Sequence, residues 1–303
     1  MDRPVHRWGH VSGSRLFRAA GCLLSLVPLT LTLAPGAAVA EAFPAPLRFE
    51  AFGIADGLSQ GSITALVEDQ RGFLWVGTLD GLNRFDGYEF RRYRPDPTDP
   101  AAIEDGSIAA LAMHPDGTLW IGTMHGGLAH YDPAQDVFRR IPSDADLDAN
   151  RYRITSLAVD ALGTLWVGTR GGLGRVVEGA GGQVTLVRSD DRHVESLLAA
   201  EERIWVGRRD GTLEAFTAGH GTDAERSLVP FPDRAPVRAI VSDARGALWI
   251  ASDGASFARL EPASGAITYR GSVDPPGSGE SPRLRALGAT VVCTTSKTRA
   301  EVE

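Results

Sequence analysis

The chain has 303 residues, of which 43% are hydrophobic and 23% charged, and its formal net charge is −7. A chain of this sign is a poor partner for nucleic acid or anionic lipid, so we expect neither as a binding partner. Its two cysteines are too few for a disulfide-rich scaffold.

Residues 1–40 have the pattern of a signal peptide. Four arginines precede an uncharged stretch with a short apolar centre, and small residues occupy the positions before Glu41. We expect cleavage after Ala40, export to the periplasm or beyond, and a mature net charge of −10, because the leader holds four arginines and one aspartate. An uncleaved membrane anchor is the alternative, since residues 19–40 carry no charge and could just span a bilayer.

Tryptophan recurs at near-constant intervals of 45, 46, 39 and 44 residues, each time in a setting such as LWVGT. A fixed period near forty indicates stacked copies of one supersecondary unit. We expect each tryptophan to be a structural wedge between neighbouring copies and not a ligand platform. These five residues are Trp75, Trp120, Trp166, Trp205 and Trp249.

Each copy divides into four short strands separated by tight turns. In the first copy the predicted strands are residues 62–69, 73–78, 82–86 and 88–94, with glycine-containing turns between them. Four antiparallel strands without a helix form one blade of a β-propeller. The sequence therefore predicts an all-β fold of about five four-stranded blades over residues 41–271.

Other repeated residues have physical roles in such a blade. A glycine three residues before the tryptophan suits a turn, and an aspartate six before it can accept N–H bonds there. A glycine two residues after the tryptophan allows neighbouring blades to approach closely. The turn glycines are Gly72, Gly117, Gly163 and Gly246; the aspartates are Asp69, Asp160 and Asp243; the close-approach glycines are Gly77, Gly122, Gly168 and Gly207.

Residues 56–100, DGLSQGSITALVEDQRGFLWVGTLDGLNRFDGYEFRRYRPDPTDP, resemble the two-component regulator propeller repeat. The resemblance extends over roughly residues 47–270. It is weaker in copy four, where Glu202 replaces the turn glycine and Arg208 the threonine, and in copy five, where Ala251 and Ser252 replace Gly-Thr. It implies the extracytoplasmic sensor region of a hybrid histidine kinase or diguanylate cyclase. The chain would then be a fragment that lacks the membrane helix and signalling enzyme of such receptors.

The two ends of the repeat region are irregular. In residues 272–303 a sixth copy begins, but Ser296 stands where tryptophan is expected, and Lys297 and Cys293 are foreign to the other copies. We expect a truncated or frameshifted, disordered repeat; a natural degenerate last strand is the alternative. Residues 47–52, LRFEAF, resemble a fourth strand and are expected to close the last blade.

Candidate binding residues lie in the turns between second and third strands, which share one rim with the linkers between blades. They vary where their neighbours repeat, which is typical of a binding rim on a repeat scaffold. His125, Arg170 and Arg208 could together hold an anionic or sugar ligand. The alternative is that each is a solvated turn residue.

The sequence favours a periplasmic ligand-sensing module of a two-component-type receptor, which binds a small molecule or oligosaccharide and catalyses nothing. No nucleotide, nucleophile or metal motif is convincing, and we expect no cofactor or metal. The alternatives are a propeller enzyme, such as a lyase or glycosidase, and a secreted interaction module. An enzyme would require paired carboxylates or a His/Glu pair on one rim. The intact receptor could dimerise, and this chain would meet a membrane only through missing regions or an uncleaved leader.

Overall fold

The computed structural model describes residues 51–142, 152–178, 184–217, 226–229, 234–253, 256–272, 283–287, 290–294 and 299–302. The chain divides into two compact units, residues 1–49 and 50–303, and every described residue belongs to the second. The predicted leader and its cleavage position therefore lie outside the described residues.

No helix within the described ranges is long and apolar enough to cross a membrane.

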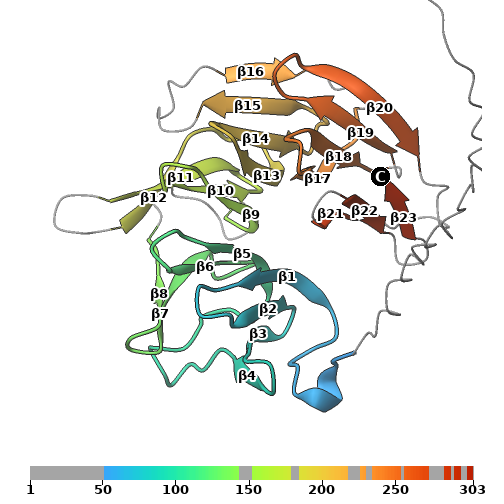
Figure 1. The fold of residues 1–303 in the computed structure, drawn as a ribbon. Helices are drawn as coiled ribbons and strands as arrows, with labels where there is room; N and C mark the ends of the chain where they lie inside the picture. The colour runs from blue at the N-terminus through green and yellow to red at the C-terminus, as the bar shows by residue number, and fades with distance from the viewer. Residues whose placement is uncertain are drawn as a thin grey trace, which may run out of the picture. The chain divides into compact units, whose positions relative to one another are not determined.

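Five four-stranded antiparallel sheets, which we call blades 1–5, each use four consecutive strands (Figure 1). A short 3-10 helix, η1 (Ile54–Asp56), precedes them. The prediction of an all-β propeller with about five blades is confirmed. The strands are β1 (Ile63–Glu68), β2 (Leu74–Thr78), β3 (Gly81–Phe85) and β4 (Phe90–Tyr93); β5 (Ile108–Met113), β6 (Leu119–Thr123), β7 (Leu128–Asp132) and β8 (Val137–Arg140); β9 (Ile154–Val159), β10 (Leu165–Thr169), β11 (Gly172–Glu178) and β12 (Val184–Arg188); β13 (Val194–Ala200), β14 (Arg203–Arg208), β15 (Leu213–Thr217) and β16 (Arg226–Val229); and β17 (Val237–Ser242), β18 (Leu248–Ser252), β19 (Ser256–Glu261) and β20 (Ala266–Ser272).

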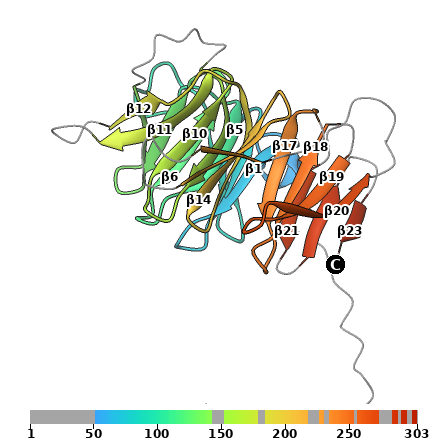
Figure 2. The ribbon, with the colours of Figure 1, turned by 90° about the horizontal axis from the view of Figure 1, so that it is seen from above.

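Successive blades meet through their first strands. β1 contacts β5, β5 contacts β9, β9 contacts β13, and β13 contacts β17. The colour gradient in Figure 1 and Figure 2 follows the same order from blade to blade. Because consecutive strands of a blade run antiparallel, the turns from second to third strand and the residues that enter each blade come to the same edge.

The hydrophobic core lies between blades, and the tryptophans of blades 1–4 pack across such interfaces. Trp75 of blade 1 clusters with Ile108, Leu119 and Ile121 of blade 2. Trp166 packs with Val194 and other side chains of blade 4, and Trp205 packs with blade 5. The structural role predicted for the tryptophans thus has a direct geometric basis, since a large apolar side chain fills the space between twisted sheets.

In blades 1, 3 and 5 one aspartate accepts hydrogen bonds from both the first turn and the tryptophan. Asp69 accepts backbone N–H bonds from the residues two and four positions later, at 2.9 and 3.0 Å, and a bond from Trp75 Nε1 at 2.9 Å. The predicted turn bonds are confirmed, and the bond to the indole is an addition. The same three bonds recur in the pairs Asp160–Trp166 and Asp243–Trp249.

The glycine two residues after the tryptophan in blades 1–4 allows the next blade to come close. A Cβ placed on Gly122 would lie 2.4 Å from Cγ2 of Ile154, which begins the first strand of blade 3. On Gly77 it would lie 2.6 Å from Cγ2 of Ile108, the corresponding residue of blade 2. No side chain fits at those distances, so the predicted close approach is confirmed.

Copy four has a different first turn. Ala200 pairs directly with Arg203, which leaves a two-residue hairpin loop, and Glu201 takes a positive φ of 56° in place of a glycine. This turn shortens the tryptophan spacing by one residue, and most of the shorter interval lies between Trp166 and the start of β13 at Val194.

The structure differs from the prediction of a disordered tail. Within residues 272–303, three short strands form an antiparallel sheet: β21 (Arg283–Leu287), β22 (Thr290–Thr294) and β23 (Arg299–Val302). The β-branched run around Val291 and Val292 suits a strand even without the tryptophan motif. Cys293 lies in this sheet, opposite Leu284 on one side and Ala300 on the other.

Most of the predicted closing strand, residues 47–50, lies outside the described residues. Ala51 and Phe52 are described and belong to no strand. The Phe52 ring lies 5.0 Å from that of Phe85 and 6.1 Å from that of Phe90, measured between centroids, so it packs on blade 1. The predicted pairing of this segment with the last blade stays a prediction.

Candidate functional site

The turns between second and third strands are built on a repeated threonine. Thr78 Oγ1 donates to the Gly81 carbonyl at 2.8 Å, and Thr169 Oγ1 to the Gly172 carbonyl at 2.9 Å. Thr123 makes the corresponding bond in blade 2. This internal bond closes each turn and leaves the residues at its tip free to vary.

A second repeated contact joins each turn to the residue that enters the same blade. The N–H of Arg170 donates to the Arg153 carbonyl at 3.1 Å, and the N–H of Arg209 to the His193 carbonyl at 3.3 Å. Equivalent bonds link Met124 to Ser107 in blade 2 and Asp253 to Pro236 in blade 5. The backbone therefore places two variable side chains together on the rim of each blade.

In blade 3 both of these side chains are arginines. Arg170 is exposed, and Arg153 is partly buried with its Nη2 2.8 Å from the Met124 sulfur. Among the described residues, no carboxylate forms an ion pair with either guanidinium. Burial first, and then repulsion from Arg170, lower the pKa of Arg153, while the Asp105 carboxylate acts in the opposite direction. Two adjacent cations without a carboxylate partner are a favourable place for an anion.

In blades 4 and 5 the rim arginines are neutralised internally. Glu195 accepts from Arg209 at 2.9 Å and from Arg238 at 2.7 Å, and only 10% of its side chain is exposed. Arg238 also makes a two-pronged pair with Asp253, at 2.7 Å for each bond. These arginines hold the rim together and have less capacity for an outside anion.

His193 joins the two groups electrostatically. Its Nε2 lies 3.5 Å from Glu195 Oε1. Burial is the largest cause that lowers the pKa of His193; Glu195 acts to raise it, and Arg209, Arg170 and Arg238 lower it further. Arg170 is therefore within electrostatic reach of His193, and the unneutralised pair of blade 3 borders the charged groups of blade 4.

The structure distinguishes the three predicted binding residues by their exposure. His125 and Arg170 are exposed at the rim. The backbone N–H of His125 donates to Asp105 Oδ2 at 2.7 Å. The placement of Arg208 at a turn tip is wrong: it ends strand β14 and is 1% exposed. It donates to Glu214 at 2.8 and 3.0 Å and forms an ion pair with Asp190.

Arg208 occupies the position at which Thr78, Thr123 and Thr169 close the turn in other blades. The alignment of the repeats already contains this signal, because a threonine position belongs to the scaffold and not to the variable tip. Arg153 lies in a predicted rim linker, but nothing in the repeat pattern singles it out. His193, Glu195 and Arg238 were also missed, since their roles depend on partners in other strands.

Among the described residues, no cluster of three or more His, Cys, Asp or Glu side chains could hold a metal ion.

The two-component regulator propeller family matches residues 57–80 and 148–171, which span the first and third tryptophan motifs. The chain carries two-component regulator propeller repeats. A curated relative, Histidine kinase P4 of Formosa agariphila, is 51% identical over 55 residues, which are 18% of this chain and 4% of the relative. The chain thus corresponds to a small part of that protein's length.

Solved structures share the propeller fold. The extracellular domain of a protein named as a hybrid two-component system of B. thetaiotaomicron has a TM-score of 0.67 and 20% identity over 84% of this chain and 35% of that one. A domain of a protein named as a one-component system of the same organism has a TM-score of 0.67 and 18% identity, over 83% and 37%. Virginiamycin B lyase from Staphylococcus aureus has a TM-score of 0.59 and 16% identity, over 79% of each chain. At these identities the likeness concerns the fold.

Proposed function

We propose that this propeller is the extracytoplasmic ligand-sensing module of a two-component-type membrane receptor, and that it acts by binding. The repeats and the relative named as a histidine kinase support the receptor context. The leader-like residues 1–40 support export. The observation that carries the binding role is the Arg153–Arg170 pair, two adjacent cations on the variable rim without a carboxylate partner among the described residues.

The rim is suited to an anionic small molecule or an acidic oligosaccharide. Arg170 is exposed and its planar guanidinium can hold a carboxylate or sulfate through two parallel bonds. The backbone bond places Arg153 beside it, so both guanidinium groups can engage one anion. His125, in the next turn, is a further exposed donor. Arg208 takes no direct part, because its donors are already used inside the protein.

Thermal-shift titration tests this proposal. The exported chain is screened against acidic and neutral oligosaccharides and small carboxylates, and each hit is repeated with Arg170→Ala and Arg153→Ala. Loss of a charge-assisted bond should weaken binding by about 1.5–3 kcal/mol, roughly tenfold or more. Arg139→Ala is the matched control, because this exposed arginine lies on β8 and pairs with Asp132.

Two results would count against the proposal. One is a hit whose affinity is the same in the wild type and both rim variants. The other is retention of the chain in the cytoplasm, which cell fractionation would detect. N-terminal sequencing of exported protein should begin at Glu41 if the leader is cleaved as expected.

A second candidate function, that of a lyase-like enzyme, has one observation in its favour. His193 and Glu195 form a His/Glu pair on the rim, the constellation that a propeller enzyme would require. However, both Glu195 oxygens already accept bonds from arginines, and these bonds would have to break before a substrate could reach the carboxylate. Product formation from a bound ligand that is abolished by His193→Ala would establish this alternative over simple binding.

A further inference from the structure

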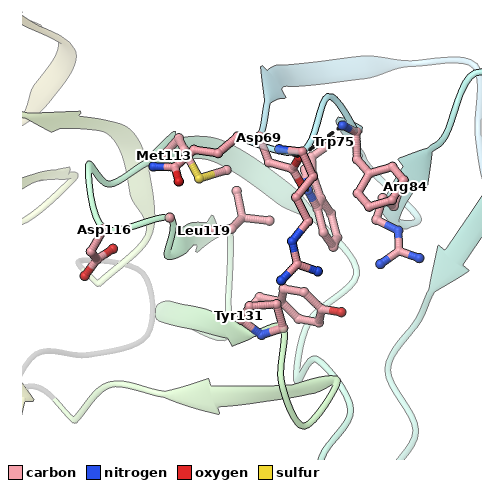
Figure 3. A pocket seen from close by; sticks show the side chains of 12 residues that line it. Asp69, Trp75, Arg84, Met113, Asp116, Leu119 and Tyr131 are labelled. Carbon is pink, nitrogen blue, oxygen red and sulfur yellow. Dashed lines mark hydrogen bonds between the residues drawn. The ribbon is translucent and has the colours of Figure 1, made fainter.

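A pocket of about 160 Å³ lies between blades 1 and 2, beside the turns that join their first and second strands (Figure 3). These turns are at the opposite end of the strands from the arginine rim. The pocket is therefore separate from the binding site proposed above, and the inference does not rest on it.

The pocket has apolar and aromatic walls from both blades. Met113, Leu119 and Tyr131 of blade 2 face Trp75 of blade 1 across it in Figure 3. Leu119, Trp75 and Tyr131 are buried and belong to one core cluster, so these walls are preformed by packing. A rigid wall of this kind lowers the entropic cost of binding.

Arg84 supplies an uncommitted positive charge to this pocket. Its guanidinium carbon lies 4.6 Å above the centroid of the Phe73 ring and 5.8 Å from that of Trp75. Stacking fixes the plane of the guanidinium, while no hydrogen bond or ion pair among the described residues uses its donors. Arg71, in the adjacent turn, is exposed and likewise has no carboxylate partner within that set.

The acidic residues of the pocket are already engaged. Asp69 accepts three N–H bonds, two from its turn and one from Trp75. Asp116 accepts the Thr118 N–H at 2.8 Å and lies 2.8 Å from the His114 ring. The arginines therefore provide the unused charged groups of the pocket, and these are hydrogen-bond donors.

Blade 5 shows that the scaffold does not demand a free arginine here. Arg259 lies opposite Trp249 just as Arg84 lies opposite Trp75. Its Nε is 3.3 Å from Asp243, and its Nη1 pairs with Glu261. This equivalent of Arg84 is thus neutralised, whereas Arg84 keeps its donors beside the pocket. In blade 3, Arg175 lies opposite Trp166, and its buried Nε has no hydrogen-bond partner among the described residues.

We infer that the pocket between blades 1 and 2 binds a small ring-containing monocarboxylate. The carboxylate meets the guanidinium of Arg84, with Arg71 as a second cation, and the ring lies among Met113, Leu119 and Tyr131. The volume suits one six-membered ring, since a cavity of about 150 Å³ accommodates benzene in another protein. A longer or branched ligand would have to extend into solvent.

Benzoate is the probe for this site, measured by ligand-observed NMR titration of the full chain at constant ionic strength. With about nine non-hydrogen atoms, it should bind with a dissociation constant on the order of 1–10 mM. Benzamide has the same shape without the charge, and acetate has the charge without the ring. Both should bind at least about tenfold more weakly, because each lacks one of the two recognised features.

Two variants assign the site, and one of them has a matched control in blade 5. Arg84→Gln should weaken benzoate binding about tenfold and remove the preference over benzamide. Arg71→Ala should weaken it about threefold, because this arginine is exposed and more strongly screened by solvent. Arg245→Ala, at the position equivalent to Arg71, should leave the affinity unchanged.

Several results would overturn the inference. These are the absence of saturable benzoate binding, equal binding of benzoate and benzamide, and an unchanged affinity in Arg84→Gln. If Arg84→Gln fails to fold, as judged by its melting temperature, the benzoate affinities of Arg71→Ala and Arg245→Ala are compared instead. Equal affinities in these two variants would then overturn the inference. Loss of benzoate binding in Arg170→Ala would move the ligand to the arginine rim and refute the pocket assignment, while supporting the proposed rim function.

Discussion

Replacement of Asp160 by alanine should be among the most damaging single changes in the first-turn motif. This carboxylate is 4% exposed and accepts the backbone N–H groups of Leu162 and Thr164 at 2.9 and 2.8 Å. It also accepts Trp166 Nε1 at 3.0 Å, and Trp166 is 2% exposed. The alanine variant would leave one buried indole donor and two turn donors without their acceptor.

The magnitude follows from which donors water can reach. Leu162 is 72% exposed, so water can replace the turn bonds, and each should cost about 0.5–1.5 kcal/mol. Water cannot easily reach the indole N–H, and its loss of partner should cost about 1–3 kcal/mol. We expect a total near 3–4 kcal/mol and a fall in melting temperature of about 6–12 °C.

Thermal unfolding followed by tryptophan fluorescence measures this effect, and Asp132→Ala is the control. Asp132 also accepts two turn N–H bonds, at 3.0 and 3.3 Å, but no indole bond among the described residues. It should therefore cost only about 1–2 kcal/mol. An Asp160→Ala variant no less stable than Asp132→Ala would refute the reasoning that the indole bond dominates.

Blade 2 shows how the fold manages without this aspartate. His114 stands at the equivalent position, and Trp120 Nε1 is buried without a hydrogen-bond partner among the described residues. The histidine instead reaches the next blade, where its Nε2 lies 2.7 Å from the Gly163 carbonyl. A contact between blades thus takes the place of a bond within the blade.

Three further predictions follow from contacts and charges. Gly122→Ala should destabilise the fold by about 1–3 kcal/mol in chemical denaturation, and Ile154→Ala should partly rescue it; additive effects of the two changes would contradict the contact. Burial acts to raise the pKa of the Asp190 carboxyl, but bonds and charge from Arg208 lower it overall. The ionised carboxylate therefore stabilises the fold above about pH 4, and this stabilisation is lost as the pH falls further. Asp190→Asn should flatten that acid dependence of the unfolding free energy. Burial, and then the neighbouring arginines, lower the pKa of His193. Neutral His193 therefore adds to the free energy of unfolding above about pH 6.5, and this stabilisation is lost as the pH falls below that value. An anion bound at the rim offsets that repulsion, so its affinity should rise as the pH falls from about 7.5 to 5.5, and His193→Gln should abolish the rise in a calorimetric titration.

The sequence predicted the blades well because the same physical requirements recur five times. The strand from residue 62 to 69 and the observed β1 (Ile63–Glu68) differ only at their ends. Gly72 and its equivalents take positive φ values near 82–90°, as a tight turn requires. A feature that is repeated can be inferred from its repetition, even where one copy alone would be ambiguous.

The site was predicted less well because its charges depend on partners from distant positions. Arg208 bonds to Asp190, 18 residues before it, and to Glu214 on the next strand. Glu195 links arginines of two blades through Arg209 and Arg238. A repeat alignment shows which positions vary, but it does not show whether a cation there is neutralised internally.

Exposure of a charged side chain alone is therefore a poor indicator of a binding site in this propeller. Whether that side chain already has an internal ion-pair partner is a better indicator. Arg209 is exposed but is held by Glu195, whereas Arg170, equally exposed, has no carboxylate partner among the described residues. Inside the blade interfaces the same contrast separates Arg259, which is paired, from Arg84, which is not. Several of the described arginines are paired with the protein's own carboxylates. Those left without such a partner beside open space, two on the rim and two at the opposite end, are where an outside anion gains most and displaces least.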